Sequence, residues 1–121
     1  MQGWHAEVTE IHHTAKRDAP SGTALRLADA VDAGRVGAGA PVGTRRSGRE
    51  GPHVPGEIGL HAVRGGDVIG EHTVYLFGPS ERVVLGHVAS DRTLFAAGAV
   101  RCARWLAGRP PGRYSVEDVL G

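Results

Sequence analysis

The stretch from His12 to Thr23 holds several side chains that can move a proton or hold a small anion. Two adjacent histidines, His12 and His13, precede Lys16, which is the only lysine among fourteen basic residues. Histidine changes its charge near neutral pH, and lysine can release a proton, whereas arginine effectively cannot. The combination predicts a site that pairs anion binding with proton transfer, but it does not identify the reaction.

A predicted helix start lies in the same stretch. Ser21 is suited to be an N-cap ahead of an apolar-periodic run, which predicts a helix over Gly22–Ala33 that ends at Gly34. The first N–H groups of a helix carry a partial positive charge and attract carboxylates and phosphates. Gly22 allows close approach of the backbone, and Thr23 adds a hydroxyl group. We therefore expect a small anion to bind at this turn, with a histidine and the lysine beside it.

The spacing of apolar residues predicts the strand and the helix that position these side chains. Alternation indicates a strand over His5–Ile11, which has one apolar side and runs into the histidines. The helix is expected to bury one stripe, made of Ala24, Leu25, Leu27, Ala28 and Val31. Its solvent side is expected to carry Arg26, Asp29 and Asp32.

The remainder of the chain is predicted to form three strands and one helix. The strands cover residues 58–64, 71–77 and 82–89, and the turn residues between them indicate an antiparallel meander. Residues 91–106 have helical periodicity. Residues 34–57 are rich in glycine and are expected to form a mobile loop, either solvated or ordered by substrate. The basic residues of this loop include Arg45, Arg46 and Arg49.

This order of elements predicts an α+β fold. We expect a two-layer sandwich in which a mixed sheet of four strands, or slightly more, carries helices on one face. The length of 121 residues suits a single domain. The other sheet face would expose apolar side chains, so we expect copies of the chain to associate face to face.

Composition argues against several classes of protein. A formal net charge of +1 does not suit a nucleic-acid binder, and no apolar run approaches the ~20 residues of a membrane span. No signal-peptide pattern is present, and the single cysteine, Cys102, indicates a reducing compartment, so we expect a cytoplasmic protein. The histidines follow no familiar zinc spacing, so no metal site is expected. Ordinary hydrogen-bonded networks are expected for His61, His72 and His87.

The string EIHHTAKRDAPSGTA at residues 10–24 closely resembles the signature of the 4-hydroxy-tetrahydrodipicolinate reductase (dihydrodipicolinate reductase) family, which acts in the diaminopimelate and lysine pathway. The resemblance continues through IGLHAVRGGDVIGEHTV at residues 58–74 and SDRTLFAAGAVRCARWL at residues 90–106. It ends with YSVEDVLG at residues 114–121. It therefore covers nearly the whole chain except the loop that is rich in glycine and arginine.

The resemblance implies an NAD(P)H-dependent oxidoreductase of two domains. An N-terminal Rossmann domain would bind NADPH or NADH, and a C-terminal domain would bind a cyclic dicarboxylate substrate and form a homotetramer. Residues 1–121 resemble the C-terminal domain. Because they contain no G-x-G-x-x-G segment, we expect the nucleotide-binding domain to be missing and this chain not to be catalytically competent alone. The alternative is an isolated oligomerisation module without catalytic activity.

The matched motifs also imply roles for single residues. His12 would be the general acid/base and Lys16 a second proton donor. Arg92 has a second interpretation, as a first-turn helix residue in a salt bridge. The substrate-binding residues implied by the resemblance are His13, Gly22, Thr23 and, as a weaker contact, Arg92.

Overall fold

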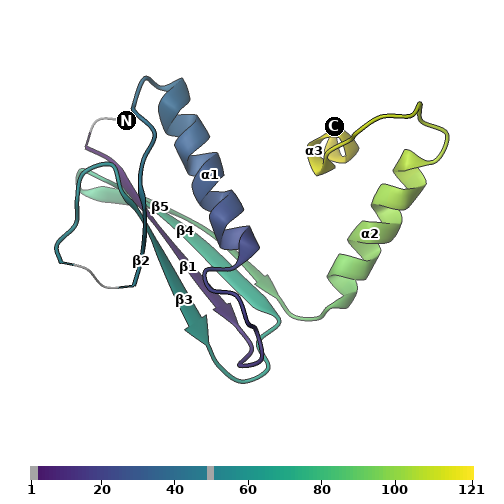
Figure 1. Cartoon of the computed structure of the whole chain (residues 1–121), viewed down its shortest axis with the longest axis horizontal. Coiled ribbons are helices and arrows are strands. Elements are labelled where there is room, and N and C mark those ends of the chain that lie inside the picture. Colours follow the sequence, from purple (N-terminus) through teal and green to yellow (C-terminus); the bar gives the residue numbers. More distant parts are fainter. Residues whose placement is uncertain (1–2, 49–50) are drawn as a thin grey trace. The chain divides into compact units, whose positions relative to one another are not determined.

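The computed structural model describes residues 3–48 and 51–121, and it divides the chain into two compact units, Met1–Val88 and Ala89–Gly121. A five-stranded mixed sheet and one long helix make up the first unit (Figure 1), so the predicted α+β class is confirmed. The sheet has the order β2-β3-β1-β4-β5, and α1 is the helix Gly22–Gly37. The strands are β1 His5–His12, β2 Arg45–Ser47, β3 Ile58–Arg64, β4 Gly70–Gly78 and β5 Glu81–Ala89.

Strand β1 lies at the centre of the sheet. It runs parallel to β3 and antiparallel to β4, so Val8 pairs with Leu60 on one side and with Val74 on the other. Side chains alternate along β1, and its even-numbered residues from Ala6 to His12 are buried. This confirms the strand with one apolar side that the sequence predicted.

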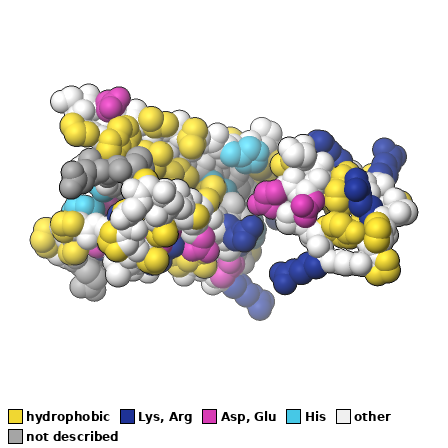
Figure 2. Space-filling model, turned by 90° about the horizontal axis from the view of Figure 1, so that it is seen from above, with side chains coloured by type: hydrophobic (Ala, Val, Ile, Leu, Met, Phe, Trp, Pro, Cys, Tyr) yellow, Lys and Arg dark blue, Asp and Glu magenta, His cyan; other side chains and the backbone are white. Residues whose placement is uncertain are grey.

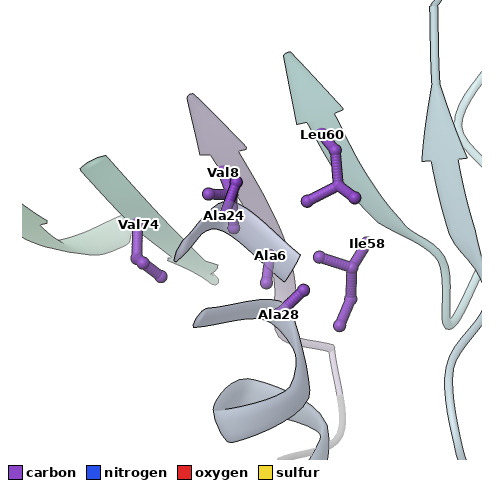
Figure 3. Close-up of a cluster of buried hydrophobic side chains, with 7 residues drawn as sticks. All are labelled: Ala6, Val8, Ala24, Ala28, Ile58, Leu60 and Val74. Carbon is purple, nitrogen blue, oxygen red and sulfur yellow. The ribbon is translucent and has the colours of Figure 1, made fainter. Parts of the chain in front are cut away.

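The core of the first unit lies between this face of the sheet and α1. Figure 3 shows Ala24 and Ala28 of the helix clustered with side chains from three strands. Alanine side chains are short, so the helix backbone can approach the sheet closely, and Val8 and Ile58 beneath it are fully buried. The core residues are Ala6, Val8, Ala24, Ala28, Ile58, Leu60 and Val74.

The predicted antiparallel meander is wrong at its first step, because β1 lies between β3 and β4. Neighbouring strands lie ~4.8 Å apart, so a connection across one strand must span ~10 Å. The residues from Gly65 to Ile69 span that gap, and Gly65 N donates to the carbonyl oxygen of His12 as the connection crosses the end of β1. The connection from β4 to β5 is a tight turn, as predicted, with Ser80 at a φ of 60°.

Helix α1 is longer than predicted, since it continues past Gly34 to Gly37. The turn that follows places Gly39 at a φ of +88°, a conformation that glycine adopts at little cost. Two side chains of α1 also lie on the opposite side from the one predicted. Leu25 is 41% exposed, whereas Asp32 is only 6% exposed.

Asp32 is buried because the segment predicted to be a mobile loop folds over it. Gly43 N and Arg45 donate to the Asp32 carboxylate at 2.8 and 3.0 Å. Next in the chain, β2 pairs in parallel with β3, and Arg46 binds Glu7 and Glu57. Arg45 and Arg46 therefore anchor this segment through ion pairs, while Arg49 lies outside the described residues.

The second unit consists of α2 (Thr93–Leu106) and α3 (Val116–Leu120). Helix α2 begins two residues later than predicted, because the Asp91 carboxylate accepts a hydrogen bond from Thr93 N. The C-terminal tail returns to α2: Tyr114 packs edge-on against Trp105, at 5.4 Å between ring centroids. Leu120, at the end of α3, is 64% exposed.

Figure 2 shows hydrophobic and arginine side chains together on the surface of this unit. Within the described residues, no helix is both long and apolar enough to cross a membrane.

Candidate functional site

The candidate site is built around a buried carboxylate, that of Glu10. This residue is 1% exposed and lies on the face of β1 that is covered by α1. Oε2 accepts from Nη1 of Arg64 at 2.7 Å and lies 2.5 Å from Nδ1 of His12. Oε1 accepts from Nη2 of Arg64 and from Ser21 N, both at 2.9 Å. Each carboxylate oxygen thus has two hydrogen-bonding partners.

These partners keep Glu10 ionised. Burial by itself raises the pKa of Glu10, since a charge is costly away from water. The hydrogen bonds from Arg64, His12 and Ser21 N act in the opposite direction and lower the pKa from the ordinary 4.5 to about 2. The site therefore holds a fixed negative charge at every pH at which the fold is expected to operate.

His12 stands at the end of β1, between this carboxylate and a second histidine. Its exposed fraction is 9%, and its ring lies edge-on to that of His72 at 5.0 Å between centroids. Burial, together with the charge of His12, lowers the pKa of His72, so His72 is neutral at neutral pH. Its Nε2 lies 3.2 Å from the hydroxyl oxygen of Ser21.

Ser21 is the N-cap of α1, as the sequence predicted. Its hydroxyl oxygen accepts from Ala24 N at 3.1 Å, and its own backbone N–H is the group that binds Glu10. Gly22 and Thr23 follow, exposed, at the first two helical positions. A protein carboxylate thus occupies one N–H at this helix start, whereas those of Gly22 and Thr23 have no protein partner within the described residues.

Lys16 lies in a turn that is connected to the same network. Its Nζ is 2.9 Å from a carboxylate oxygen of Asp18, and this hydrogen bond lowers the pKa of Asp18. The carbonyl oxygen of Asp18 accepts from Nη2 of Arg64 at 2.8 Å. Arg64 therefore links the segment that carries Lys16 to the carboxylate that binds His12.

A cavity of about 280 Å³ opens beside the helix start. It lies between α1 and strands β4 and β5, and both Thr23 and His72 line it. Its remaining lining side chains are mostly apolar, which suits a small ring with polar groups at its edge. Among the described residues, no group of three or more His, Cys, Asp or Glu side chains is placed to hold a metal ion.

The structure groups most of the sequence-predicted site residues in the first unit. His12, Gly22 and Thr23 lie around the Glu10 network, and Lys16 is connected to it through Asp18. The side chain of His13 is half-buried beside His12. Arg92 belongs to the second unit, where it is exposed and precedes the first residue of α2.

Glu10 and Arg64 were not among the site residues predicted from the sequence. One signal was available: Glu10 falls on the apolar side of its strand, in phase with Ala6 and Val8. A carboxylate at a core position needs a buried partner, because an unpaired buried charge is costly. Its partner is 54 residues away in the sequence, and only the pairing of β1 with β3 brings it close.

His61 and His72 do form hydrogen bonds, as expected of the strand histidines. His72 binds Ser21, and His61 lies 2.5 Å from a carboxylate oxygen of Glu7 on the sheet face away from α1. Arg46 binds the same carboxylate. A Cβ atom at Gly59 would overlap the Glu7 carboxylate, so a larger residue at this position would require the Glu7 side chain to move.

Comparison with known proteins gives consistent matches over the whole chain. The family model described as "Dihydrodipicolinate reductase, C-terminus" matches residues 1–120. A protein of Myxococcus xanthus named 4-hydroxy-tetrahydrodipicolinate reductase is 50% identical over 98% of this chain and 44% of its own length. One of Methanosarcina mazei with the same name is 53% identical over 100% of this chain and 44% of its own length. The chain therefore spans less than half the length of these relatives.

A solved structure has the same fold. It is described as "Dipicolinate bound Dihydrodipicolinate reductase from Paenisporosarcina sp. TG-14" and aligns with a TM-score of 0.68 over 94% of this chain and 44% of that one. The two sequences are 24% identical, so this likeness supports the fold alone.

Proposed function

Since the chain belongs to the dihydrodipicolinate reductase C-terminus family, as its motifs predicted, we propose that it is the substrate-binding part of a 4-hydroxy-tetrahydrodipicolinate reductase. In this proposal it binds a cyclic dicarboxylate and supplies the proton for its reduction. The observation that carries the proposal is the network in which one carboxylate, that of Glu10, binds both His12 and the N-cap of α1.

The chemistry of the site suits such a ligand. One carboxylate group would lie on the free N–H groups of Gly22 and Thr23, where the helix start is positive. His13 and Lys16 would supply further positive or hydrogen-bonding groups, with Lys16 exchanging Asp18 for the ligand. His12 would be the general acid and Lys16 a second proton donor. Arg92 is proposed as a weaker substrate contact only because it stands in the matching motif SDRTLF.

The nicotinamide cofactor, NADPH or NADH, is proposed to bind outside this chain, mainly on an N-terminal Rossmann domain. The 121 residues contain no G-x-G-x-x-G segment that follows a strand and opens a helix. The start of α1, which does follow a strand, is capped by Ser21 and has the sequence SGTA. These residues therefore do not fit a dinucleotide.

Binding of pyridine-2,6-dicarboxylate tests the proposal. We expect calorimetric titration to show binding to the unchanged chain and a loss of affinity of about 10-fold or more for Lys16→Ala and for His13→Ala. A hydrogen bond to a charged group contributes about 1.5–3 kcal/mol, and each 1.4 kcal/mol corresponds to a factor of about ten.

Two controls make this titration specific. Arg17→Ala removes a neighbouring positive charge from an exposed position, and it is expected to change the affinity by less than about 3-fold. Pyridine-3-carboxylate, with a single carboxylate, is expected to bind more weakly than the diacid. Absence of binding to the unchanged chain, or equal affinity in Lys16→Ala and Arg17→Ala, would show that the site assignment is wrong.

We also propose that copies of the chain associate through the sheet face away from α1, giving a homotetramer. This face carries Val63, Val84 and Val88, which are 50%, 48% and 62% exposed. The neighbours of β5 show which of its residues lie on each face of the sheet. A Cβ atom at Gly86 would lie 3.7 Å from Thr73, whose strand partner Thr9 is on the outer face, whereas Leu85 lines the cavity beside α1.

Two adjacent valines of β5 test this interface. Val84→Glu places a charge on the outer face and is expected to reduce the assembly to monomers in sedimentation at micromolar concentration. Val83→Glu changes a residue of similar exposure, 44%, on the other face of the same strand, and is expected to leave the assembly intact. Equal behaviour of the two variants would contradict the proposed interface. A monomeric unchanged chain would contradict this proposal and also the alternative of a pure oligomerisation module.

A further inference from the structure

We propose that Glu10 is a positioning residue that fixes His12 with its proton on Nδ1, so that Nε2 is the atom from which His12 delivers a proton. The role in proton delivery rests on the proposed function. The orientation of the ring rests on the contacts of the Glu10 carboxylate alone.

The contact between His12 and Glu10 determines which ring nitrogen of His12 carries the hydrogen. An ionised carboxylate has no hydrogen to donate and can only accept. Nδ1 of His12 lies 2.5 Å from Oε2 of Glu10, and the carboxylate stays ionised down to a pH of about 2. Nδ1 must therefore carry the hydrogen of this bond. In neutral His12 the lone pair is then on Nε2.

The same contact determines which ring nitrogen of His12 can release a proton at the lower cost. Protonated His12 carries a hydrogen on both nitrogens. Transfer from Nδ1 would remove one of the four hydrogen bonds to a buried carboxylate. Transfer from Nε2 breaks the Nε2–H bond, leaves the electron pair on nitrogen and passes the proton to the ligand, while the bond from Nδ1–H to Glu10 persists. The second route keeps the buried charge fully paired.

The Glu10 carboxylate is held in its orientation toward His12 by other hydrogen bonds. Arg64 holds both oxygens through its two terminal nitrogens, at 2.7 and 2.9 Å, which fixes the plane of the carboxylate. Ser21 N holds Oε1, so the same group also anchors the N-cap of α1. Glu10 thereby couples the orientation of His12 to the helix start that is proposed to bind the ligand.

Gly70 lies next to Nε2, on the side of the His12 ring opposite Glu10. A Cβ atom built at Gly70 would lie 3.2 Å from Nε2 of His12, closer than ordinary van der Waals contact. Gly70 is buried at the first position of β4. Glycine at this position leaves Nε2 uncrowded, which a nitrogen that exchanges protons requires.

Nitrogen NMR of isotope-labelled histidine in this chain tests the inference, because it distinguishes the protonated ring nitrogen from the unprotonated one. The measurement is made about two units above the ordinary histidine pKa of ~6.5. In the unchanged chain, His12 is expected to show a protonated Nδ1 and an unprotonated Nε2.

In Glu10→Gln the amide oxygen can replace only one carboxylate oxygen. Because Ser21 N–H can only donate, that oxygen is expected to face Ser21 and the amide NH₂ to face His12. The expected result is a change of tautomer, with the hydrogen moving to Nε2.

Glu7→Gln is the matched control. Glu7 lies 2.5 Å from His61 on the other face of the same strand, so this variant is expected to change the signals of His61 and to leave those of His12 unchanged. If Glu10→Gln does not fold, Glu10→Gln combined with Arg64→Met removes the unpaired guanidinium and is measured instead, with the same expected tautomer.

An unprotonated Nδ1 in the unchanged chain, or an Nδ1 that stays protonated in both Glu10 variants, would overturn the inference. Binding of pyridine-2,6-dicarboxylate is measured on the same samples. A chain that shows the tautomer change but binds no dicarboxylate would refute the proposed function and leave the orientation of His12 by Glu10 standing.

Discussion

Acidification is expected to lower the free energy of unfolding of the first unit by about 3 kcal/mol through one carboxyl group, that of Glu10. Its pKa is about 2 in the folded chain, against an ordinary 4.5. In this range the unfolded chain binds a proton that the folded chain does not. The stabilisation is therefore complete above pH 4.5 and is lost as the pH falls toward 2.

Denaturant unfolding of the unchanged chain and of Glu10→Gln, measured across this pH range, isolates the contribution. Asp18 and Asp32, whose hydrogen bonds to Lys16 and to Gly43 N lower their pKa values, add to the acid sensitivity of both proteins alike. We expect the unchanged chain to lose about 3 kcal/mol more than the variant. Parallel pH dependences of the two proteins would contradict the assigned state of Glu10.

Arg64→Ala is expected to lower the free energy of unfolding by about 3 kcal/mol at neutral pH. Removal of one partner of a buried ion pair costs about 3–5 kcal/mol, because the other charge stays buried without compensation. The lower end applies here, since the Arg64 side chain is 20% exposed while that of Glu10 is 0% exposed. Urea unfolding at fixed pH measures the effect.

The double variant Glu10→Gln with Arg64→Met separates this explanation from a mere loss of packing. With both charges gone, no buried charge is left unpaired, so the double variant is expected to be more stable than Arg64→Ala despite carrying two changes. The stability of Arg64→Lys is expected to lie between those of the unchanged chain and Arg64→Ala. An ammonium group keeps the charge but cannot hold both carboxylate oxygens in one plane. A double variant less stable than Arg64→Ala would show that the ion pair is not the reason for the loss.

The site also explains why the conspicuous charged residues of the chain are not all available to a ligand. Arg45 and Arg46, which the sequence placed in a solvated or substrate-ordered loop, neutralise carboxylates of α1, β1 and the segment before β3. Within residues 3–48 and 51–121, the Lys16 side chain forms an ion pair with Asp18, whose side chain is 60% exposed. An ion pair with one partner this exposed is weak, so the proposed dicarboxylate ligand would displace Asp18 at little cost.

The local features of this protein could be predicted from its amino-acid sequence. Apolar alternation in His5–Ile11 and helical spacing after Ser21 were sufficient to place β1 and the start of α1, because each pattern is a property of a few neighbouring residues. The motif around His12 and Lys16 likewise indicated the family and a candidate position for the site.

The order of the strands in the sheet and the burial of particular charges could not be predicted from local sequence patterns. The position of β1 between β3 and β4, and the burial of Asp32 under residues 43–45, depend on contacts between distant segments. Glu10 is the clearest case, since its partner Arg64 arrives from another strand. A buried charge is stable only where such a partner meets it, and no local pattern records that meeting.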